Sequence, residues 1–338
     1  MGDWKMKTEQ IDIYIDGKMV QTTYYFQDGY VMVPVLFFKY AGILVDYNNK
    51  NHSIVLRKDK ILITLFKHQC KSEIFIEGSE TVLHDSLLTA PNEIKDVIYI
   101  PFFYIVQKFG LVFWSNMEIS RIYLITNSLP RWNTNVYYRG AAAGNKIALT
   151  FDDGPDNYYT PKILDILGNK KVPATFFVVG QQIQWCPNML KRIVKEGHAL
   201  GNHSWSHPKF SNLTTSQIKE EISRTENEIA ILTGERKTTL FRPPYGDFTN
   251  ADLNLISESG YKFILWSVDT LDWTGLSAEE IIAIVRRDLS PGAIVLQHSL
   301  KMSPGILDGT VKALSILIDE LIAKGYEFVT IECLLKSN

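Results

Sequence analysis

The sequence predicts an α/β protein in which a parallel, barrel-like sheet follows a smaller α+β domain made of two related halves. From residue 146 onward, short apolar segments alternate with segments of helical periodicity, as in parallel strands joined by helical crossovers. Before that point, the chain repeats a pattern of strand, short helix and second strand. We therefore expect an N-terminal domain at 1–127, a linker at 128–145 and a second domain at 146–338.

One proline and one glycine mark each copy of the N-terminal repeat. Pro34 and Gly42 bracket an apolar segment in the first copy, and Pro101 and Gly110 bracket its counterpart in the second. Because proline favours the start of a helix and glycine its end, each copy predicts a short helix between two strands. The pattern resembles the copper amine oxidase N-terminal-like domain of bacterial cell-surface proteins, although no copper site is visible in it. We expect a cell-wall or interaction domain.

The residues that follow have the features of a linker and then of a barrel. Residues 128–145 are polar and irregular, which is typical of a linker. Thr214-x-x-Gln217 and Ser277-x-x-Glu280 match capping boxes at helix starts, and Gly234 and Gly325 fit helix ends. Seven apolar segments favour a barrel whose working residues lie at the C-terminal strand ends. These segments are 147–151, 174–179, 199–203, 240–242, 263–268, 293–297 and 328–331.

Composition restricts the classes of partner and location. The formal net charge of −2, without a long run of Lys and Arg, argues against nucleic acid as the main partner. No apolar stretch reaches the roughly 20 residues that a membrane span requires, and three scattered cysteines make no disulfide framework. Residues 1–7 lack the apolar core of an export signal. We therefore expect either a cytosolic protein or an exported one whose signal is absent from this sequence.

Five polar motifs each follow one of the expected strands. Each has an ordinary explanation when it stands alone: a solvated turn, a chance histidine spacing, a structural arginine, a loop acid, or a core tryptophan or histidine. Five such coincidences at five strand ends are improbable together. The paired histidines are four residues apart, which brings both to one metal ion if the loop begins a helical turn. The motifs are Thr150-Phe-Asp-Asp-Gly-Pro155, His203-Ser-Trp-Ser-His-Pro208, Arg242-Pro-Pro-Tyr-Gly246, Asp269-Thr-Leu-Asp-Trp273 and Leu296-Gln-His298.

In this order the five motifs resemble the polysaccharide deacetylase family, also called carbohydrate esterase family 4 or the NodB-homology domain. The resemblance covers residues from about Lys146 to Ile331. It implies a distorted (β/α)7 barrel and a catalytic Zn2+, or another divalent ion such as Co2+, Ni2+ or Mn2+. It also implies that Asp153, His203 and His207 are the metal ligands.

The same resemblance implies a role for each remaining motif residue. Asp152 would act as the general base, and Arg242 would pair with it. The backbone N–H of Tyr245 would stabilise the oxyanion. His298 would protonate the departing sugar amine, and Asp272 would orient that histidine.

Trp273 and Leu296 would line a small apolar pocket for the acetyl methyl group. The expected activity is metal-dependent removal of N-acetyl groups from N-acetylglucosamine in a polysaccharide, with peptidoglycan ahead of chitin-type glycans. Alternatives within the family are a chitooligosaccharide deacetylase and an O-acetyl xylan esterase. Alternatives from other classes are a non-catalytic wall-binding protein and a non-haem iron oxygenase, which also uses two histidines and a carboxylate. With peptidoglycan as the substrate, the expected location is extracellular or cell-wall associated.

Overall fold

The structure, a computed structural model, describes residues 8–116, 121–126, 135–140, 144–234, 237–300 and 303–336. The chain divides into two compact units. Unit 1 comprises Met1–Trp132, Phe210–Ile218 and Phe248–Leu255, and unit 2 comprises Asn133–Lys209, Lys219–Asp247 and Ile256–Asn338. No helix among the described residues is long and apolar enough to cross a membrane.

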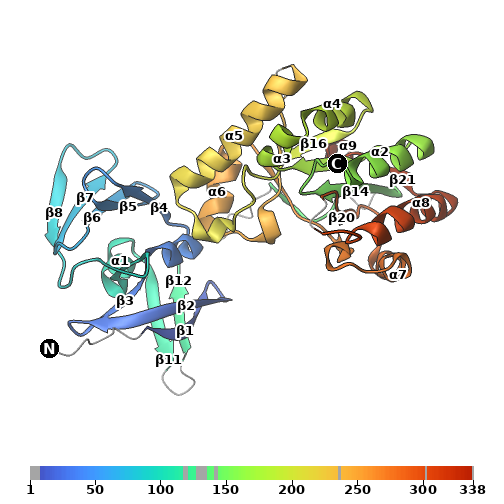
Figure 1. Cartoon of the computed structure of the whole chain (residues 1–338). Coiled ribbons are helices and arrows are strands. Elements are labelled where there is room, and N and C mark those ends of the chain that lie inside the picture. The colour runs from blue at the N-terminus through green and yellow to red at the C-terminus, as the bar shows by residue number, and fades with distance from the viewer. Residues whose placement is uncertain are drawn as a thin grey trace. The chain divides into compact units, whose positions relative to one another are not determined.

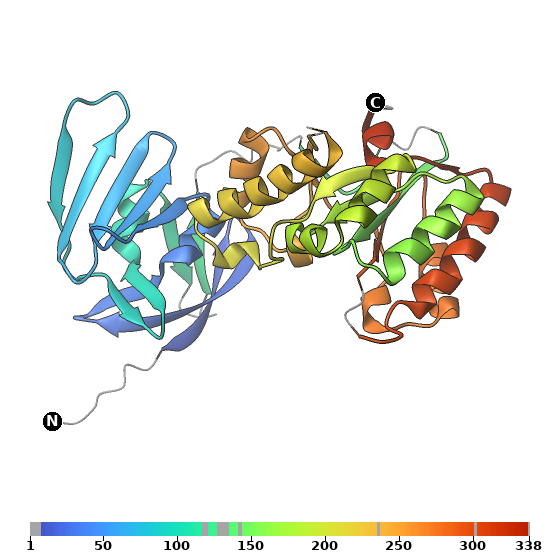
Figure 2. The same ribbon diagram turned by 45° about the horizontal axis from the view of Figure 1, so that its top comes forward.

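Unit 1 contains two sheets (Figure 1). The larger has the order β11-β12-β1-β2-β3-β10-β9, and the smaller is the antiparallel meander β4 to β8, whose strands lie side by side in Figure 2. The larger sheet consists of β1 Glu9–Ile15, β2 Lys18–Gln27, β3 Tyr30–Pro34, β9 Asn92–Ile94, β10 Val97–Pro101, β11 Val112–Asn116 and β12 Arg121–Ile125. The smaller consists of β4 Leu44–Asn48, β5 Ser53–Lys58, β6 Ile61–Phe66, β7 Lys71–Ile76 and β8 Val82–Ser86, and the two short helices are η1 Val35–Ala41 (3-10) and α1 Phe102–Lys108.

The expected repeat is present in unit 1, and its two copies diverge at one end. Pro34 and Pro101 end the paired antiparallel strands β3 and β10 and precede η1 and α1. Gly42 and Gly110 follow those helices with φ of 78° and 63°, the left-handed conformation that ends a helix. The first copy then continues into the five-stranded sheet and the second into the seven-stranded sheet.

Unit 2 is built on a curled parallel sheet with the order β13-β18-β17-β16-β15-β14-β20-β19, and β21 pairs with β14. Its strands are β13 Val136–Tyr137, β14 Lys146–Asp152, β15 Thr175–Val178, β16 Ala199–Asn202, β17 Leu240–Phe241, β18 Lys262–Ile264, β19 Val268–Asp269, β20 Ile294–His298 and β21 Glu327–Phe328. The helices after β13 are α2 Tyr159–Lys170, α3 Gly180–Trp185, α4 Pro187–Lys195, α5 Thr215–Thr233, α6 Asn250–Glu258, α7 Ala278–Asp288, α8 Asp308–Ala323 and α9 Ile331–Lys336, with 3-10 turns η2 Phe210–Asn212, η3 Pro244–Gly246 and η4 Asp272–Thr274. Of these, η2, residues 215–218 of α5 and residues 250–255 of α6 belong to unit 1.

One short segment closes this sheet into a distorted barrel. β18 pairs with β17, whereas β19, only three residues further on, pairs with β20 on the other side of the sheet. Between them, Leu265 donates its N–H to Tyr137 O and Ser267 donates its N–H to Ile294 O. The single strand expected at 263–268 is therefore wrong in extent. The chain must bend there because one straight strand cannot pair with both sides.

Two other boundaries differ from the sequence prediction. Within the expected linker 128–145, Val136 and Tyr137 pair with β18, and Gly140 donates its N–H to Gly292 O. Residues 128–134 and 141–143 of that linker lie outside the described residues. The strand expected at 328–331 stops at Phe328, because Thr330 accepts N–H bonds from the first turn of α9.

The strand β14 shows how unit 2 separates its apolar core from a polar interior. Ile147, Leu149 and Phe151 point to the outer core, against which the helices α2, α7 and α8 pack (Figure 1). Because side chains alternate along a strand, Thr150 and Asp152 point the other way, into the barrel. Two buried polar side chains thus lie on the inner face at the C-terminal end of β14.

Candidate active site

Two adjacent carboxylates end β14 and both reach one histidine. Asp152 is 3% exposed, and its Oδ2 lies 3.6 Å from Nε2 of His203. Asp153 adopts a left-handed conformation with φ of 72°, and its Oδ1 lies 3.4 Å from the same nitrogen. A Cβ on Gly154 would lie 2.4 Å from Oγ of Ser299, so a side chain there would displace that serine. The left-handed conformation at Asp153 thus directs both neighbouring carboxylates towards Nε2 of His203.

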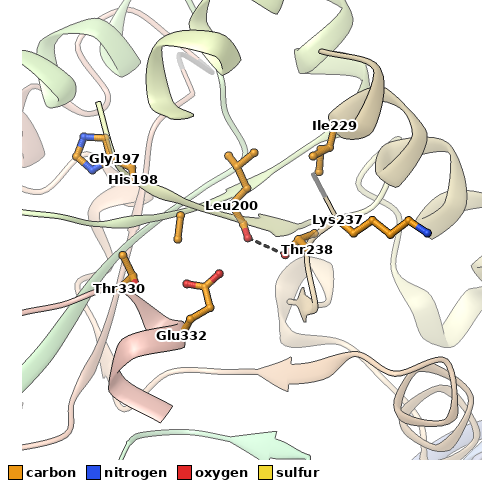
Figure 3. A pocket seen from close by; sticks show the side chains of 9 residues that line it. Gly197, His198, Leu200, Ile229, Lys237, Thr238, Thr330 and Glu332 are labelled. Atoms are coloured by element: carbon orange, nitrogen blue, oxygen red, sulfur yellow. Dashed lines mark hydrogen bonds between the residues drawn. The ribbon is translucent and has the colours of Figure 1, made fainter. Parts of the chain in front are cut away.

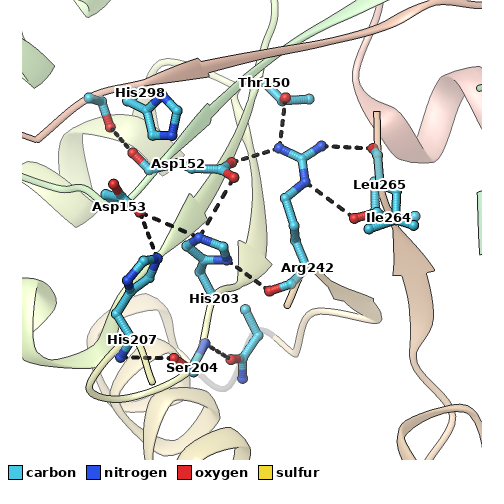
Figure 4. A network of polar contacts seen from close by, with 12 residues as sticks. Thr150, Asp152, Asp153, His203, Ser204, His207, Arg242, Ile264, Leu265 and His298 are labelled. Carbon is cyan, nitrogen blue, oxygen red and sulfur yellow. Dashed lines mark hydrogen bonds and ion pairs between the residues drawn. The ribbon is translucent and has the colours of Figure 1, made fainter. Parts of the chain in front are cut away.

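Asp153, His203 and His207 form the one cluster in the described part of the chain with metal-ligand spacing (Figure 4). One donor atom from each lies within 4.8 Å of the others, and Nε2 of His207 is 3.1 Å from Oδ1 of Asp153. One carboxylate and two imidazoles are a donor set that suits zinc and leaves coordination positions open. These residues therefore fit a divalent ion. Burial opposes ionisation of Asp153, but the two imidazoles and the charge of His298 hold its pKa well below the ordinary range.

The tautomer of His203 suits metal binding. Its Nδ1 lies 2.8 Å from the backbone oxygen of Arg242, which can only accept, so Nδ1 carries the proton. The lone pair is then on Nε2, the atom that faces Asp153. A carbonyl behind the ring is a common means of orienting a ligating histidine.

The loop that carries the two histidines is not a helical turn, so the condition attached to their spacing is wrong. Ser204 and His207 have positive φ of 68° and 60°, and these left-handed residues bring the rings to a centroid distance of 5.0 Å. Glu221 on α5 accepts the backbone N–H groups of Trp205 and Ser206 at 2.8 Å each. The loop is therefore held from outside rather than by helical hydrogen bonds.

Arg242 is fully buried and aims its guanidinium at Asp152. Nη1 donates to Oδ1 of Asp152 at 2.6 Å and to Oγ1 of Thr150 at 2.9 Å. Nε and Nη2 donate to the carbonyls of Ile264 and Leu265 at the barrel-closing bend. The Arg242 pair supplies the counter-charge that a buried carboxylate needs and leaves Oδ2 of Asp152 facing His203.

Asp272 and His298 form a second acid–histidine pair. Nδ1 of His298 donates to Oδ1 of Asp272 at 2.7 Å, and Oδ2 of Asp272 accepts from the His298 N–H and from Oγ1 of Thr310. Burial disfavours the charged ring, but Asp272, with further help from Asp153 and Asp152, raises the pKa of His298 to about 9. His298 is thus held protonated near neutral pH, next to Asp152 in the strand pairing.

The three remaining expected site residues lie in different surroundings. Tyr245 has φ of 60°, its side chain is 63% exposed, and its ring lies 4.5 Å from that of His207. Leu296 is buried in β20 opposite Thr150. Trp273 lies in η4 and is 52% exposed. Tyr245 thus adjoins the cluster directly, whereas Trp273 has a large free surface.

A cavity of about 230 Å3 lies elsewhere in unit 2 (Figure 3). It is at the amino ends of β16 and β17, next to His198 and Thr238, and also contacts Glu332. His198 is buried and accepts the Ala174 N–H at Nδ1, so it serves the sheet. The residues at the carboxyl ends of the strands are not part of this cavity.

Four residues that support the site were not predicted from the sequence. Thr150 binds Arg242, Asn202 accepts the Ser204 N–H, and Thr310 binds Asp272. Glu221 holds the histidine loop. Thr150 begins the first motif and Asn202 directly precedes the second, where a polar residue in an apolar strand was a usable signal. Glu221 and Thr310 lie on helices and carry no such signal.

Comparison with known proteins identifies the family. The polysaccharide deacetylase family profile matches residues 139–264. A peptidoglycan-N-acetylglucosamine deacetylase of Bacillus cereus is 40% identical over 209 residues, which cover 61% of this chain and 75% of that protein. A chitooligosaccharide deacetylase of Bradyrhizobium sp. is 34% identical, covering 60% and 96%. The solved structure of the Bc1960 peptidoglycan N-acetylglucosamine deacetylase aligns with a TM-score of 0.58 and 39% identity, covering 60% and 93%. The chain therefore belongs to the polysaccharide deacetylase family.

Proposed function

We propose that this protein is a metal-dependent deacetylase that removes N-acetyl groups from N-acetylglucosamine in peptidoglycan. The observation that carries the proposal is the Asp153–His203–His207 donor set beside an arginine-paired Asp152. The peptidoglycan substrate is supported by the names of the Bacillus cereus relative and of the Bc1960 structure. Peptidoglycan lies outside the cytoplasmic membrane, so the proposal includes an extracellular or cell-wall location, which fractionation of cells would test.

Asp153, His203 and His207 would hold the ion, with Zn2+ favoured and Co2+, Ni2+ or Mn2+ as alternatives. When bound, such an ion acts as a Lewis acid, which lowers the pKa of water towards neutral pH and polarises the acetyl carbonyl. Asp152 takes the proton of the attacking water through Oδ2, the oxygen that Arg242 leaves free. The fixed Arg242 bond keeps that carboxylate aimed at the reacting atoms.

The second half of the reaction belongs to His298. The water oxygen forms a bond to the acetyl carbon, the C–N bond breaks, and Nε2 of His298 gives its proton to the departing amine. Asp272 binds Nδ1 and so leaves Nε2 as the donor. The products are acetate and a free amino sugar.

Tyr245, Trp273 and Leu296 complete the proposed site. The backbone N–H of Tyr245 would donate to the oxyanion, since its left-handed turn adjoins His207. Leu296 and Trp273 would contact the acetyl methyl group. The large exposed area of Trp273 also suits contact with a sugar ring.

A chitooligosaccharide is the second candidate substrate, because the Bradyrhizobium relative with that name is matched over 96% of its length. The chemistry would be the same, so only substrates distinguish the two. An acetylated xylan panel would test the O-acetyl esterase alternative, and metal analysis would test the iron oxygenase.

Mass spectrometry of purified peptidoglycan and chitopentaose, before and after treatment with the protein, tests the proposal. We expect loss of acetyl groups from peptidoglycan, abolished by a chelator and restored by zinc. Asp152→Asn is the matched control, because it keeps the metal ligands. Acetyl loss that survives complete chelation would refute the metal-dependent mechanism, and a non-catalytic wall-binding protein would leave both glycans unchanged.

A further inference from the structure

Lys39 is a buried lysine in η1 of unit 1, only 1% exposed. Its Nζ lies 2.9 Å from Oδ1 of Asp252 and donates to the backbone oxygens of Phe210 and Leu213 at 2.7 and 2.6 Å. Two backbone oxygens thus accept from the ammonium group, and the carboxylate of Asp252 balances its charge. A charge this deep in the protein is tolerated only with such partners.

The three oxygens belong to the starts of two helices. Leu213 immediately precedes Thr214, whose Oγ1 accepts the Gln217 N–H in the capping box of α5. Asp252 caps α6, because its Oδ2 accepts the Thr249 N–H at 2.8 Å. One ammonium group therefore ties together the first turns of α5 and α6.

Neighbouring residues of η1 and β4 bind the same two segments, 210–218 and 248–255. Val45 donates its N–H to Oγ1 of Thr215 at 3.1 Å, and the Ser216 N–H is bound by Oδ1 of Asp46 at 2.7 Å. Tyr40 O accepts from Nδ2 of Asn250 at 2.8 Å. Segment 35–48 thus grips both helix starts by side-chain and backbone hydrogen bonds, with Lys39 as the central contact.

The internal repeat indicates that this lysine is not needed by the fold of the N-terminal domain itself. The offset that relates Pro34 to Pro101 places Val106 at the position of Lys39 in the second copy. Val106 is buried in the apolar core of unit 1. The second copy therefore folds with an apolar side chain at this position. The charge in the first copy is explained by the helix starts that Lys39 binds.

Both helix starts continue directly from loops of the candidate active site. Phe210 follows His207 by three residues, and Phe248 follows Tyr245 by three residues. α5 also carries Glu221, which holds the backbone of the histidine loop. Any displacement of these helix starts is passed along the chain to a metal ligand and to the proposed oxyanion donor.

We propose that Lys39 is a positioning residue for the active site: it fixes the segments after the loop His203–Pro208 and after the turn Pro243–Gly246. Its effect on metal binding and turnover rests on the proposed function. Its effect on the order of the two loops does not.

The test is Lys39→Met in the full chain, read by hydrogen–deuterium exchange and by zinc titration. We expect amide exchange in residues 203–218 and 243–255 to be at least about tenfold faster than in the wild type, because a charged hydrogen-bond network is lost. We also expect about tenfold weaker zinc binding, the usual scale for losing support of a ligand. Because this variant leaves Asp252 buried without its cation, Lys39→Met/Asp252→Asn is measured beside it; the amide oxygen of Asn can still accept from Thr249.

Lys58→Met is the matched control. Lys58 also donates to a carbonyl at the end of η1, that of Ala41 at 2.8 Å, and this bond lies within the N-terminal repeat and not on segment 210–218 or 248–255. We expect wild-type exchange in the site loops of this variant. Unchanged exchange in 203–209 and 243–247 in both Lys39 variants would overturn the positioning role, as would faster exchange with unchanged zinc affinity. A wild-type protein that binds no zinc would instead refute the proposed function, and exchange in the loops would still decide the role of Lys39.

Discussion

Two buried ion pairs in this protein consist of similar groups, but we expect one to serve catalysis and the other to hold structure. Arg242 with Asp152, and Lys39 with Asp252, each join an acid and a base that are at most 4% exposed in their side chains. Arg242 binds one oxygen of Asp152 and leaves Oδ2 beside His203. Oδ1 of Asp252 lies 2.9 Å from Nζ of Lys39 in an ion pair, and its Oδ2 accepts the Thr249 N–H. An acid whose second oxygen faces the candidate metal ligands can accept a proton there, whereas an acid enclosed by a lysine and a helix start can only hold structure.

Replacing Asp152 gives the largest expected effect on activity. Asp152→Asn removes the proposed proton acceptor and preserves the size of the side chain, so we expect turnover to fall by about 10²–10⁴-fold. Zinc stoichiometry should stay that of the wild type, because Asp153, His203 and His207 are untouched. Steady-state deacetylation assays with metal analysis measure both. A variant with wild-type turnover would remove Asp152 from the mechanism.

Removing a proposed metal ligand should abolish activity and leave the fold intact. His203→Ala deletes one of three donors, so we expect loss of stoichiometric zinc together with activity, while far-UV circular dichroism stays unchanged. The contrasting variant is His198→Ala, which removes a buried histidine outside the cluster and should keep zinc. Full zinc occupancy in His203→Ala would contradict its role as a ligand.

Breaking the pair of Lys39 and Asp252 should lower the stability of the protein. Lys39→Met leaves the Asp252 carboxylate buried without its cation, and we expect a loss of about 3–5 kcal/mol in the free energy of unfolding. Lys39→Met/Asp252→Asn should recover part of that loss, because no charge is left buried. Urea denaturation of the three proteins measures this. Equal stability of wild type and Lys39→Met would show that the pair contributes nothing.

The pair of Asp272 and His298 is expected to shift a titration. In the metal-free protein the pKa of His298 is raised to about 9, so its stabilising contribution is complete below the unfolded pKa of about 6.5 and is lost as pH rises through about 9. Asp272→Asn removes the charge that holds the proton, and the pKa of His298 should fall towards its ordinary value. NMR titration of the metal-free protein measures it. If the pKa of His298 stayed near 9 in this variant, the pairing would be contradicted.

The smallest expected effect concerns a buried amide outside either pair. Gln297 is 1% exposed in β20, and neither polar atom of its amide has a hydrogen-bond partner among the described residues. An unsatisfied buried polar group costs about 1–3 kcal/mol. Gln297→Met should therefore raise the free energy of unfolding by about 1 kcal/mol without changing turnover. A lower melting temperature would reveal a partner for this amide, such as a buried water.

The same contrast separates what the sequence could predict from what it could not. The chemistry of the site was readable because Asp152, Asp153, His203 and His298 each end an apolar segment, and parallel strands bring those ends together. Capping boxes at Thr214 and Ser277 were readable because their signals are local.

Contacts between distant segments were not readable. The split of 263–268 into β18 and β19 depends on pairing with two different strands. The loop with left-handed Ser204 and His207 is held by distant and neighbouring acceptors: Asn202 accepts the Ser204 N–H, and Glu221 accepts the N–H groups of Trp205 and Ser206. Lys39 and Asp252 are far apart in the sequence, and neither lies in a recognisable motif.

The most direct test of the central claim measures acetate release from peptidoglycan and bound zinc on the same protein sample, for wild type and Asp152→Asn. We predict one zinc per chain in both proteins, with acetate release in the wild type alone. Acetate release by metal-free wild type, or by Asp152→Asn at the wild-type rate, would contradict the account.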